Sequence, residues 1–204
     1  MTPKHPRSLT SLLNKYADHT DKESVHHYGH WYDRWLSSHE SSSNILELGC
    51  SLFGAGDLLA LAEFFPEGTI VGVDISLENV IEPVRRNQRI ILQQGNVYVP
   101  EAVSLVQMKH ATLFDIIIDD CLHTPEDQVI AFSLWSQLLK PEGLYIIEDI
   151  IDLPYLLYRL GDLTREWETV IGDSRRLGSE TRSDSILLCL KRHGEADAKT
   201  EFAE

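Results

Sequence analysis

The chain has 204 residues, of which 43% are hydrophobic and 25% charged, so it can form one domain with a full hydrophobic core. Its formal net charge of −14 argues against a nucleic-acid backbone or an anionic membrane surface as the main partner. We find neither a signal-peptide core nor an apolar run long enough to span a membrane. The three cysteines lack paired spacing, which favours a reducing compartment, and we therefore expect a cytoplasmic protein.

Residues 1–40 are predicted to form an N-terminal helical and aromatic segment. A short helix is expected over residues 8–16, and four histidines and three aromatic side chains follow between His19 and Tyr32. Two compatible interpretations stay open. The segment can dock its aromatic side chains on the domain, or it can form a flap over a small-molecule site, with Tyr28 and Tyr32 as candidate substrate contacts. Its tryptophans could also serve a contact in a homo-oligomer.

After the polar linker at residues 41–43, short apolar segments alternate with amphipathic ones. This alternation predicts an α/β fold with a parallel sheet and helices on both faces. The expected elements are, in chain order, strand 44–48, helix 57–65, strand 69–74, helix 76–86, strand 89–94, helix 100–108, strand 114–119, helix 125–139, strand 143–148 and helix 154–160.

The end of the chain has a different pattern. Two further strands are expected at residues 167–171 and 185–191, and the polar stretch between them has no helical pattern. We therefore expect these strands to pair as an antiparallel hairpin, which gives a mostly parallel, seven-stranded sheet. This domain is assigned to residues 41–192, and residues 193–204 are expected to form a disordered tail.

The centre of the predicted site is the segment 114–123. It begins as a buried, β-branched strand and ends with Asp119, Asp120 and, three residues after the second acid, His123. The Thr-Pro-Glu-Asp run that follows is typical of a helix start. The acids and the imidazole therefore lie between the carboxyl end of a strand and a helix, where open parallel sheets bind ligands.

The turn after the first strand predicts a nucleoside cofactor site. Its glycines, Gly49, Gly54 and Gly56, let a ligand approach the backbone, but their spacing differs from the dinucleotide fingerprint and no P-loop Lys-Ser/Thr follows. Asp74 closes the second strand and could accept both ribose hydroxyls, and Asn96 after the third strand could meet an adenine edge. Glycines used for packing and a helix-capping acid are the alternative, which three polar features at successive strand ends disfavour.

A second pair of acids is expected next to the end of the central strand. The strand 143–148 should lie next to it, so Glu148 and Asp149 end beside Asp119 and Asp120. Four carboxylates there repel unless a cation or protons lie among them, and their hard oxygen ligands suit Mg²⁺ or Mn²⁺. Glu148 and Asp149 can both reach the site only if the strand has ended there. The alternative is that these acids cap helices.

The motifs Glu47-Leu48-Gly49, Asp74 and Gly95-Asn96, together with the order of elements, resemble class I S-adenosylmethionine-dependent methyltransferases. Residues 15–149 resemble more closely the metal-dependent sugar O-methyltransferases of macrolide tailoring, of the mycinamicin and demethylmacrocin type. The motifs of this second likeness are Lys15-Tyr16, Thr20-Asp21-Lys22, His27-Tyr28, Asp119-Asp120-x-x-His123 and Pro141-x-Gly143-Leu144-Tyr145-x-Ile147-Glu148-Asp149. The chain departs from the family at Cys121-Leu122, where Gly-Ser is usual, in its Gly-Cys-Ser-Leu-Phe-Gly loop, and in its short length.

The resemblance implies a Rossmann-like class I methyltransferase fold whose catalytic domain binds S-adenosyl-L-methionine. The cofactor-binding residues that it implies are Glu47, Gly49, Cys50, Ser51, Asp74, Ile75, Asn96 and Asp119. It also implies Asp120, Glu148 and Asp149 as the metal ligands.

These inferences predict a Mg²⁺-assisted O-methyltransferase of natural product biosynthesis that acts on a hydroxyl of a sugar or glycosylated small molecule. The cation lowers the pKa of the hydroxyl, and His123 acts as the general base. A different small-molecule acceptor, a nicotinamide-dependent reductase and a non-catalytic domain that binds an adenosine ligand stay open as alternatives. His123 could also be a buried imidazole that pins a loop. We expect neither a nucleic acid nor a membrane as partner.

Overall fold

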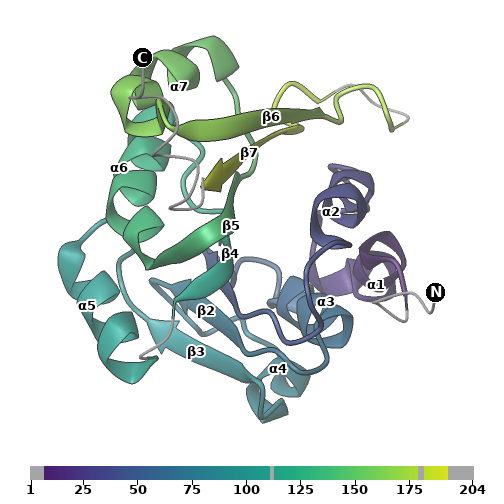
Figure 1. Cartoon of the computed structure of the whole chain (residues 1–204). Coiled ribbons are helices and arrows are strands. Elements are labelled where there is room, and N and C mark those ends of the chain that lie inside the picture. The colour runs from purple at the N-terminus through teal and green to yellow at the C-terminus, as the bar shows by residue number, and fades with distance from the viewer. Residues whose placement is uncertain (1–6, 111–112, 179–181, 193–204) are drawn as a thin grey trace.

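The computed structural model describes residues 7–110, 113–178 and 182–192, so the predicted tail at 193–204 lies outside the described residues. Its centre is one seven-stranded sheet with the order β3-β2-β1-β4-β5-β7-β6 (Figure 1). The strands are β1 (Ile45–Leu48), β2 (Ile70–Asp74), β3 (Ile90–Gln94), β4 (Phe114–Asp119), β5 (Leu139–Ile147), β6 (Trp167–Asp173) and β7 (Ile186–Arg192). β1 to β5 pair in parallel, and β7 is antiparallel to β5 and β6. The predicted parallel sheet and terminal hairpin are confirmed.

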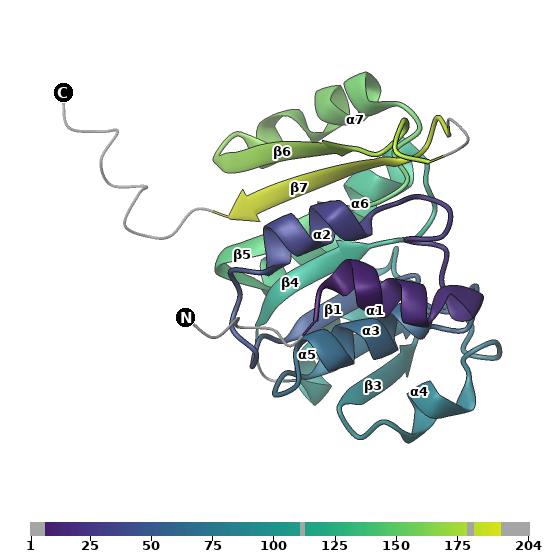
Figure 2. The same ribbon diagram turned by 90° about the vertical axis from the view of Figure 1, so that its right-hand side faces the viewer.

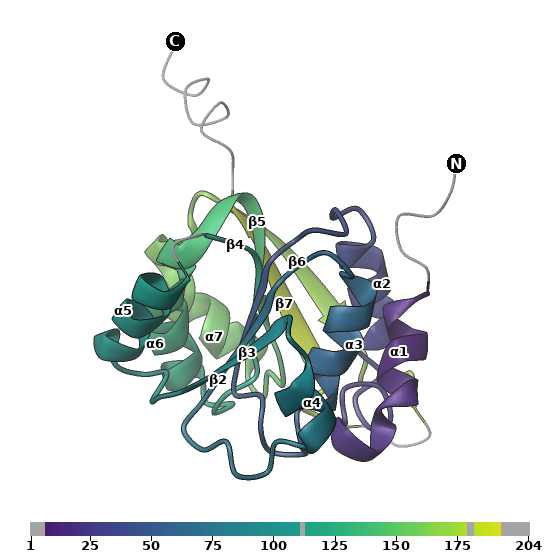
Figure 3. The ribbon, with the colours of Figure 1, turned by 90° about the horizontal axis from the view of Figure 1, so that it is seen from below.

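Helices cover both faces of the sheet, as Figure 1 and the view from below in Figure 3 show. One face carries α1 (Leu9–Lys15), α2 (Gly29–Leu36), α3 (Gly56–Phe64) and α4 (Glu82–Arg86). The other face carries α5 (Pro100–Lys109), α6 (Pro125–Trp135) and α7 (Leu153–Leu160). Short 3₁₀ turns are formed by Ala17–His19, Ser136–Leu138 and Gly161–Thr164. No helix among the described residues has both the length and the apolar character needed to cross a bilayer.

Side-chain alternation along β1 divides the core into two layers. Ile45 packs in the layer beneath α1 to α4, whereas Leu46 and Leu48 pack in the layer beneath α5 to α7. Because successive strand residues face opposite sides, Glu47 shares the side of Ile45, and it is fully buried there. A carboxylate thus occupies a position of the apolar core, and burial of this kind requires a partner.

The N-terminal segment, residues 7–40, packs on the face that Figure 2 looks onto. Ser8 Oγ caps α1 by accepting a hydrogen bond from the Ser11 backbone N–H at 3.2 Å. The Asp33 carboxylate of α2 accepts the backbone N–H of Leu9 at 2.5 Å and the Thr10 hydroxyl at 2.7 Å, which ties α1 to α2. Leu9 of α1 and Tyr32 of α2 pack in the same core cluster as Ile45 of β1, so both helices share the core of the sheet. The predicted division of the chain at residue 41 stays a prediction.

Three predicted element boundaries are wrong. α4 begins at Glu82 rather than at residue 76, because Pro83 lacks an N–H and is tolerated only in the first turn of a helix. β5 begins at Leu139 rather than at residue 143, and a 3₁₀ turn at residues 136–138 replaces the expected end of α6. The early part of β5 pairs with β4 before a register shift, which the apolar pattern alone did not reveal.

We predict that Gly49→Ala strongly destabilises the fold. Gly49 has a φ of +82°, and an added Cβ would lie 2.0 Å from the backbone oxygen of Asp120. An alanine with a left-handed backbone conformation and its Cβ against the Asp120 backbone should lower the free energy of unfolding by more than about 2 kcal/mol. Urea denaturation measures this loss. Gly95→Ala is the control, because its Cβ would meet Ala102 at an ordinary 3.5 Å. Equal losses in the two variants would contradict this explanation.

Candidate active site

A cavity of about 500 Å³ opens at the carboxyl ends of the parallel strands. Eight residues that the sequence analysis placed in the site line it, namely Gly49, Cys50, Asp74, Ile75, Asn96, Asp120, His123 and Asp149. They end or follow five different strands, β1 to β5, and meet here because the carboxyl ends of parallel strands share one edge of the sheet. His19, Thr20 and Asp21 of the N-terminal segment also line the cavity.

Six other predicted site residues do not line this cavity: Tyr28, Tyr32, Glu47, Ser51, Asp119 and Glu148. Ser51 contributes through its backbone N–H, which donates to Asp74 Oδ2 at 2.8 Å. Asp119 is buried on the α5–α7 side, where the Tyr145 hydroxyl donates to it at 3.2 Å. Burial raises the pKa of Asp119 to about 7, although the Cys121 and Tyr145 hydrogen bonds oppose the rise.

The part of the cavity beside the glycine turn combines one carboxylate with exposed apolar side chains. Asp74 accepts the backbone N–H groups of Ser51 and, at 3.1 Å, Ser76, so its carboxylate is held between two loops. Ile75, Leu52 and Phe53 line the same cavity and are more than half exposed. An acceptor of hydroxyl hydrogens beside uncovered apolar surface is the combination that a nucleoside requires.

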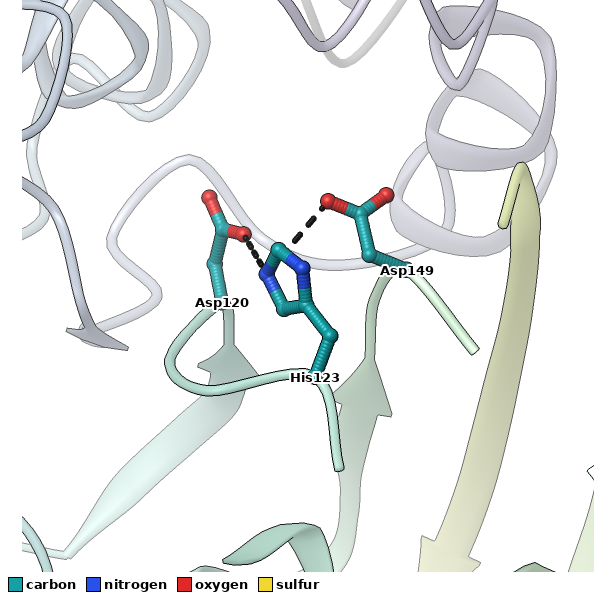
Figure 4. Close-up of side chains that lie close together, drawn as sticks. All are labelled: Asp120, His123 and Asp149. Carbon is teal, nitrogen blue, oxygen red and sulfur yellow. Dashed lines mark ion pairs between the residues drawn. The ribbon is translucent and has the colours of Figure 1, made fainter. Parts of the chain in front are cut away.

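At the other end of the cavity, His123 lies between two carboxylates, as Figure 4 shows. Its Nε2 is 3.6 Å from Asp120 Oδ1 and 3.5 Å from Asp149 Oδ2. The neighbouring Asp120 carboxylate raises the pKa of His123, burial opposes the rise and the Asp149 charge adds to it. One ligand atom from each of the three residues lies within 4.8 Å of the others, so the group could hold a metal ion.

Glu148 and Asp149 both belong to the acid cluster because β5 has already ended. The strand stops at Ile147, and Asp149 adopts a left-handed φ of 52°. The alternation that would send neighbouring side chains to opposite faces therefore no longer applies. Asp149 lines the cavity, whereas Glu148 lies behind it and is 1% exposed.

A buried lysine of the N-terminal segment lies among the acids. Lys22 is 3% exposed, and its Nζ donates to Glu148 and, at 2.6 Å, to Asp120 Oδ2. The same Nζ is 3.1 Å from Glu47 and 3.8 Å from Asp57. Burial lowers the pKa of the ammonium, but the carboxylates of Asp120, Glu148 and Glu47 outweigh it and raise the pKa well above its ordinary value. Lys22 is therefore a fixed positive charge.

Two tyrosines and a histidine from the same segment satisfy other acid oxygens. The Tyr32 hydroxyl donates to Glu148 Oε1, and the Tyr28 hydroxyl donates to Asp149 Oδ1 at 2.5 Å. His26 Nδ1 lies 3.2 Å from the same oxygen of Asp149. Both tyrosine side chains are almost fully buried against the acids and do not line the cavity. The sequence had predicted them as substrate contacts.

The sequence analysis assigned no role to Lys22, Asp57 or His26. Lys22 stood inside the Thr-Asp-Lys motif of the resemblance, and Asp57 was only the first residue of the expected helix 57–65. A signal was nevertheless present in β1, since a charged residue between two buried leucines, as in Leu46-Glu47-Leu48, requires a buried partner of opposite charge.

Comparison with known proteins identifies the family of this chain. Residues 39–192 match the family model described as a methyltransferase domain, and the chain therefore belongs to this family. The assignment to methyltransferases made from the sequence is thereby confirmed.

Two curated relatives with sequence similarity to this chain are O-methyltransferases. The chain is 30% identical over 149 residues to demethylmacrocin O-methyltransferase of Streptomyces fradiae, covering 70% of this chain and 36% of the relative. It is 30% identical over 131 residues to mycinamicin VI 2''-O-methyltransferase of Micromonospora griseorubida, covering 59% and 32%. The chain thus spans about a third of the length of these relatives.

A solved structure shares the fold. The MycE methyltransferase of the mycinamycin biosynthetic pathway, in complex with Mg, SAH and mycinamycin VI, matches with a TM-score of 0.70 at 21% identity. The match covers 98% of this chain and 57% of MycE.

We predict that Tyr32→Phe lowers the free energy of unfolding by about 1–3 kcal/mol, because a buried oxygen of Glu148 loses its donor. Tyr155→Phe is the matched control, since it removes a hydroxyl that donates to exposed Glu126 and should cost less than about 1 kcal/mol. Urea denaturation measures both. A Tyr32 variant as stable as the control would show that Glu148 does not depend on this hydrogen bond.

Proposed function

We propose that this chain is an S-adenosylmethionine-dependent O-methyltransferase domain that uses Mg²⁺ or Mn²⁺ to methylate a hydroxyl of a sugar-containing small molecule. The observation that carries the proposal is that Asp74 and the group Asp120, His123 and Asp149 line one cavity. A cofactor and an acceptor could thus meet within it. The names of the curated relatives, which are macrolide O-methyltransferases, support the acceptor class.

The cofactor would bind where the glycine turn meets Asp74. Each oxygen of the Asp74 carboxylate accepts one backbone N–H, which leaves each a lone pair for a ribose hydroxyl. Ile75 and Asn96 provide an apolar face and an amide for the base. Gly49 and Cys50 let the rest of the molecule approach the backbone after β1. These residues fit an adenosine-containing ligand.

The divalent ion would bind at Asp120 and Asp149. Asp120 Oδ1 and Asp149 Oδ2 are hard oxygen ligands of the kind that Mg²⁺ prefers, and both residues line the cavity. Once bound, such an ion polarises an alcohol oxygen and lowers its pKa. Because Mg²⁺ favours oxygen over imidazole, we assign His123 to proton transfer rather than to the metal.

In the proposed reaction, the neutral His123 imidazole accepts the proton of the acceptor hydroxyl, and the neighbouring carboxylates of Asp120 and Asp149 stabilise the imidazolium that results. The hydroxyl oxygen forms a bond to the methyl carbon, and the carbon–sulfur bond breaks with its electron pair going to sulfur. S-Adenosylhomocysteine leaves, so the protein needs no covalent intermediate. Residues 19–21 form part of the cavity wall.

The cofactor half of the proposal is tested by calorimetric titration with S-adenosylhomocysteine. We expect binding to the unaltered chain and at least about a tenfold loss of affinity in Asp74→Ala, because a charged acceptor of ribose hydroxyls is removed. Asp162→Ala removes an exposed acid of the 3₁₀ turn Gly161–Thr164 and should bind normally. Absence of binding to the unaltered chain would end the proposal, and thermal melting of each variant checks its fold.

The catalytic half is tested with His123→Ala and a panel of glycosylated acceptors. We expect turnover to fall by about 10²-fold or more, while binding of S-adenosylhomocysteine and of Mn²⁺ stays near that of the unaltered chain. His110→Ala, which changes a histidine outside the cavity lining, is the control and should keep its activity. Undiminished turnover in His123→Ala would remove this residue as the base.

A further inference from the structure

We propose that the Lys22 ammonium is the resident cation of an inner acid group (Glu47, Asp57 and Glu148), so that the site takes a single divalent ion at Asp120 and Asp149. Lys22 is thus a positioning residue. This inference rests on the proposed function, because it concerns how the metal of that function is held. It assigns Glu148 to the lysine, whereas the family resemblance placed that acid among the metal ligands.

The first observation is that the acids form two groups able to hold a cation. Asp120, His123 and Asp149 form one, and Glu47, Asp57 and Asp120 form the other, with ligand atoms within 4.8 Å of one another in each. Lys22 Nζ contacts all three acids of the second group. A positive charge supplied by the protein thus already fills the second position.

The second observation concerns how Asp120 divides its oxygens between the groups. Oδ2 accepts a hydrogen bond from Lys22 at 2.6 Å, whereas Oδ1 faces His123 Nε2 at 3.6 Å. One oxygen therefore belongs to the lysine and the other to the cavity. Because both oxygens belong to one carboxylate, the ammonium also determines the direction in which Oδ1 points at the proposed metal position.

The third observation is that both oxygens of Glu148 already accept hydrogen bonds from buried donors. Its Oε2 accepts from Lys22 and its Oε1 accepts from Tyr32, and the side chain is buried behind the cavity wall. Asp149 Oδ2, in contrast, faces His123, whose side chain lines the same cavity. A divalent ion at Glu148 would lie beside the Lys22 ammonium that this carboxylate already binds, and the two positive charges would repel each other.

The fourth observation is that Glu47 needs the same ammonium. Its carboxylate is fully buried, and neither oxygen has a hydrogen-bond partner among the described residues. Lys22 Nζ at 3.1 Å is its ion-pair partner. A covalently attached cation cannot dissociate, so it keeps the inner acids in one arrangement whether or not the divalent ion is bound. It also holds the N-terminal segment against the acid end of the cavity.

The test is a Mn²⁺ titration of the purified chain followed by electron paramagnetic resonance, which counts bound ions without an activity assay. We expect one ion for the unaltered chain. Lys22→Met, which keeps the length of the side chain but removes its charge, should bind two ions, because Glu47, Asp57 and Asp120 are released as a second site. Lys15→Met, in an exposed lysine of the same segment, should still bind one.

A second comparison keeps the proposal falsifiable if Lys22→Met does not fold. Asp149→Asn should weaken Mn²⁺ binding by at least about tenfold, whereas Glu148→Gln should leave it within about threefold. Equal losses in these two variants, or a single ion in a folded Lys22→Met variant, would overturn the role of Lys22 and leave the proposed function standing. An unaltered chain that binds S-adenosylhomocysteine but no Mn²⁺ would instead overturn the metal part of the proposed function, and this inference with it.

Discussion

The arrangement of this site depends on one buried ammonium group among carboxylates that come from distant parts of the chain. Lys22 comes from the N-terminal segment, and its partners come from three strands of the sheet. Glu47 lies in β1, Asp120 directly follows β4 and Glu148 directly follows β5. At the low effective dielectric of a protein interior, acids so close together repel strongly unless a cation or protons separate them. Burial and neighbouring acids do raise the pKa of Glu47 and Glu148 well above ordinary values, despite the opposing effect of Lys22. The ion pairs of Lys22 with these acids join the N-terminal segment to the cavity edge of the sheet.

The parallel sheet and its alternating side chains explain why the two acids at the end of β4 face opposite layers. Asp119 faces the α5–α7 layer with Tyr145, and Asp120 faces the opposite layer with Lys22. After β5 the left-handed turn at Asp149 brings one more carboxylate to the cavity. Many proteins share this fold with other functions, so the methyltransferase proposal rests on the family match and on these side chains rather than on topology.

Much of the fold was predictable because its signals are local. The buried β-branched strand Phe114–Asp119 was predicted at its observed boundaries, and the helix that starts at Pro125 was predicted from its capping threonine. The errors lie where a local signal competes with another constraint. Pro83 moves the start of α4 to Glu82. The start of β5 depends on its pairing with β4, which includes a register shift. Hydrophobic periodicity reports neither of these effects.

The sequence by itself determined which residues end the parallel strands, and hence that Asp74, Asp120 and His123 would share one edge of the sheet. It did so because strand composition and helix starts are encoded by near neighbours in the chain. Only the tertiary structure decided that Lys22 would reach these acids and that Tyr32 would donate to Glu148, 116 residues away in sequence. Such contacts depend on how the N-terminal segment docks on the sheet. The periodic pattern of residues within that segment does not indicate which distant side chains it will contact.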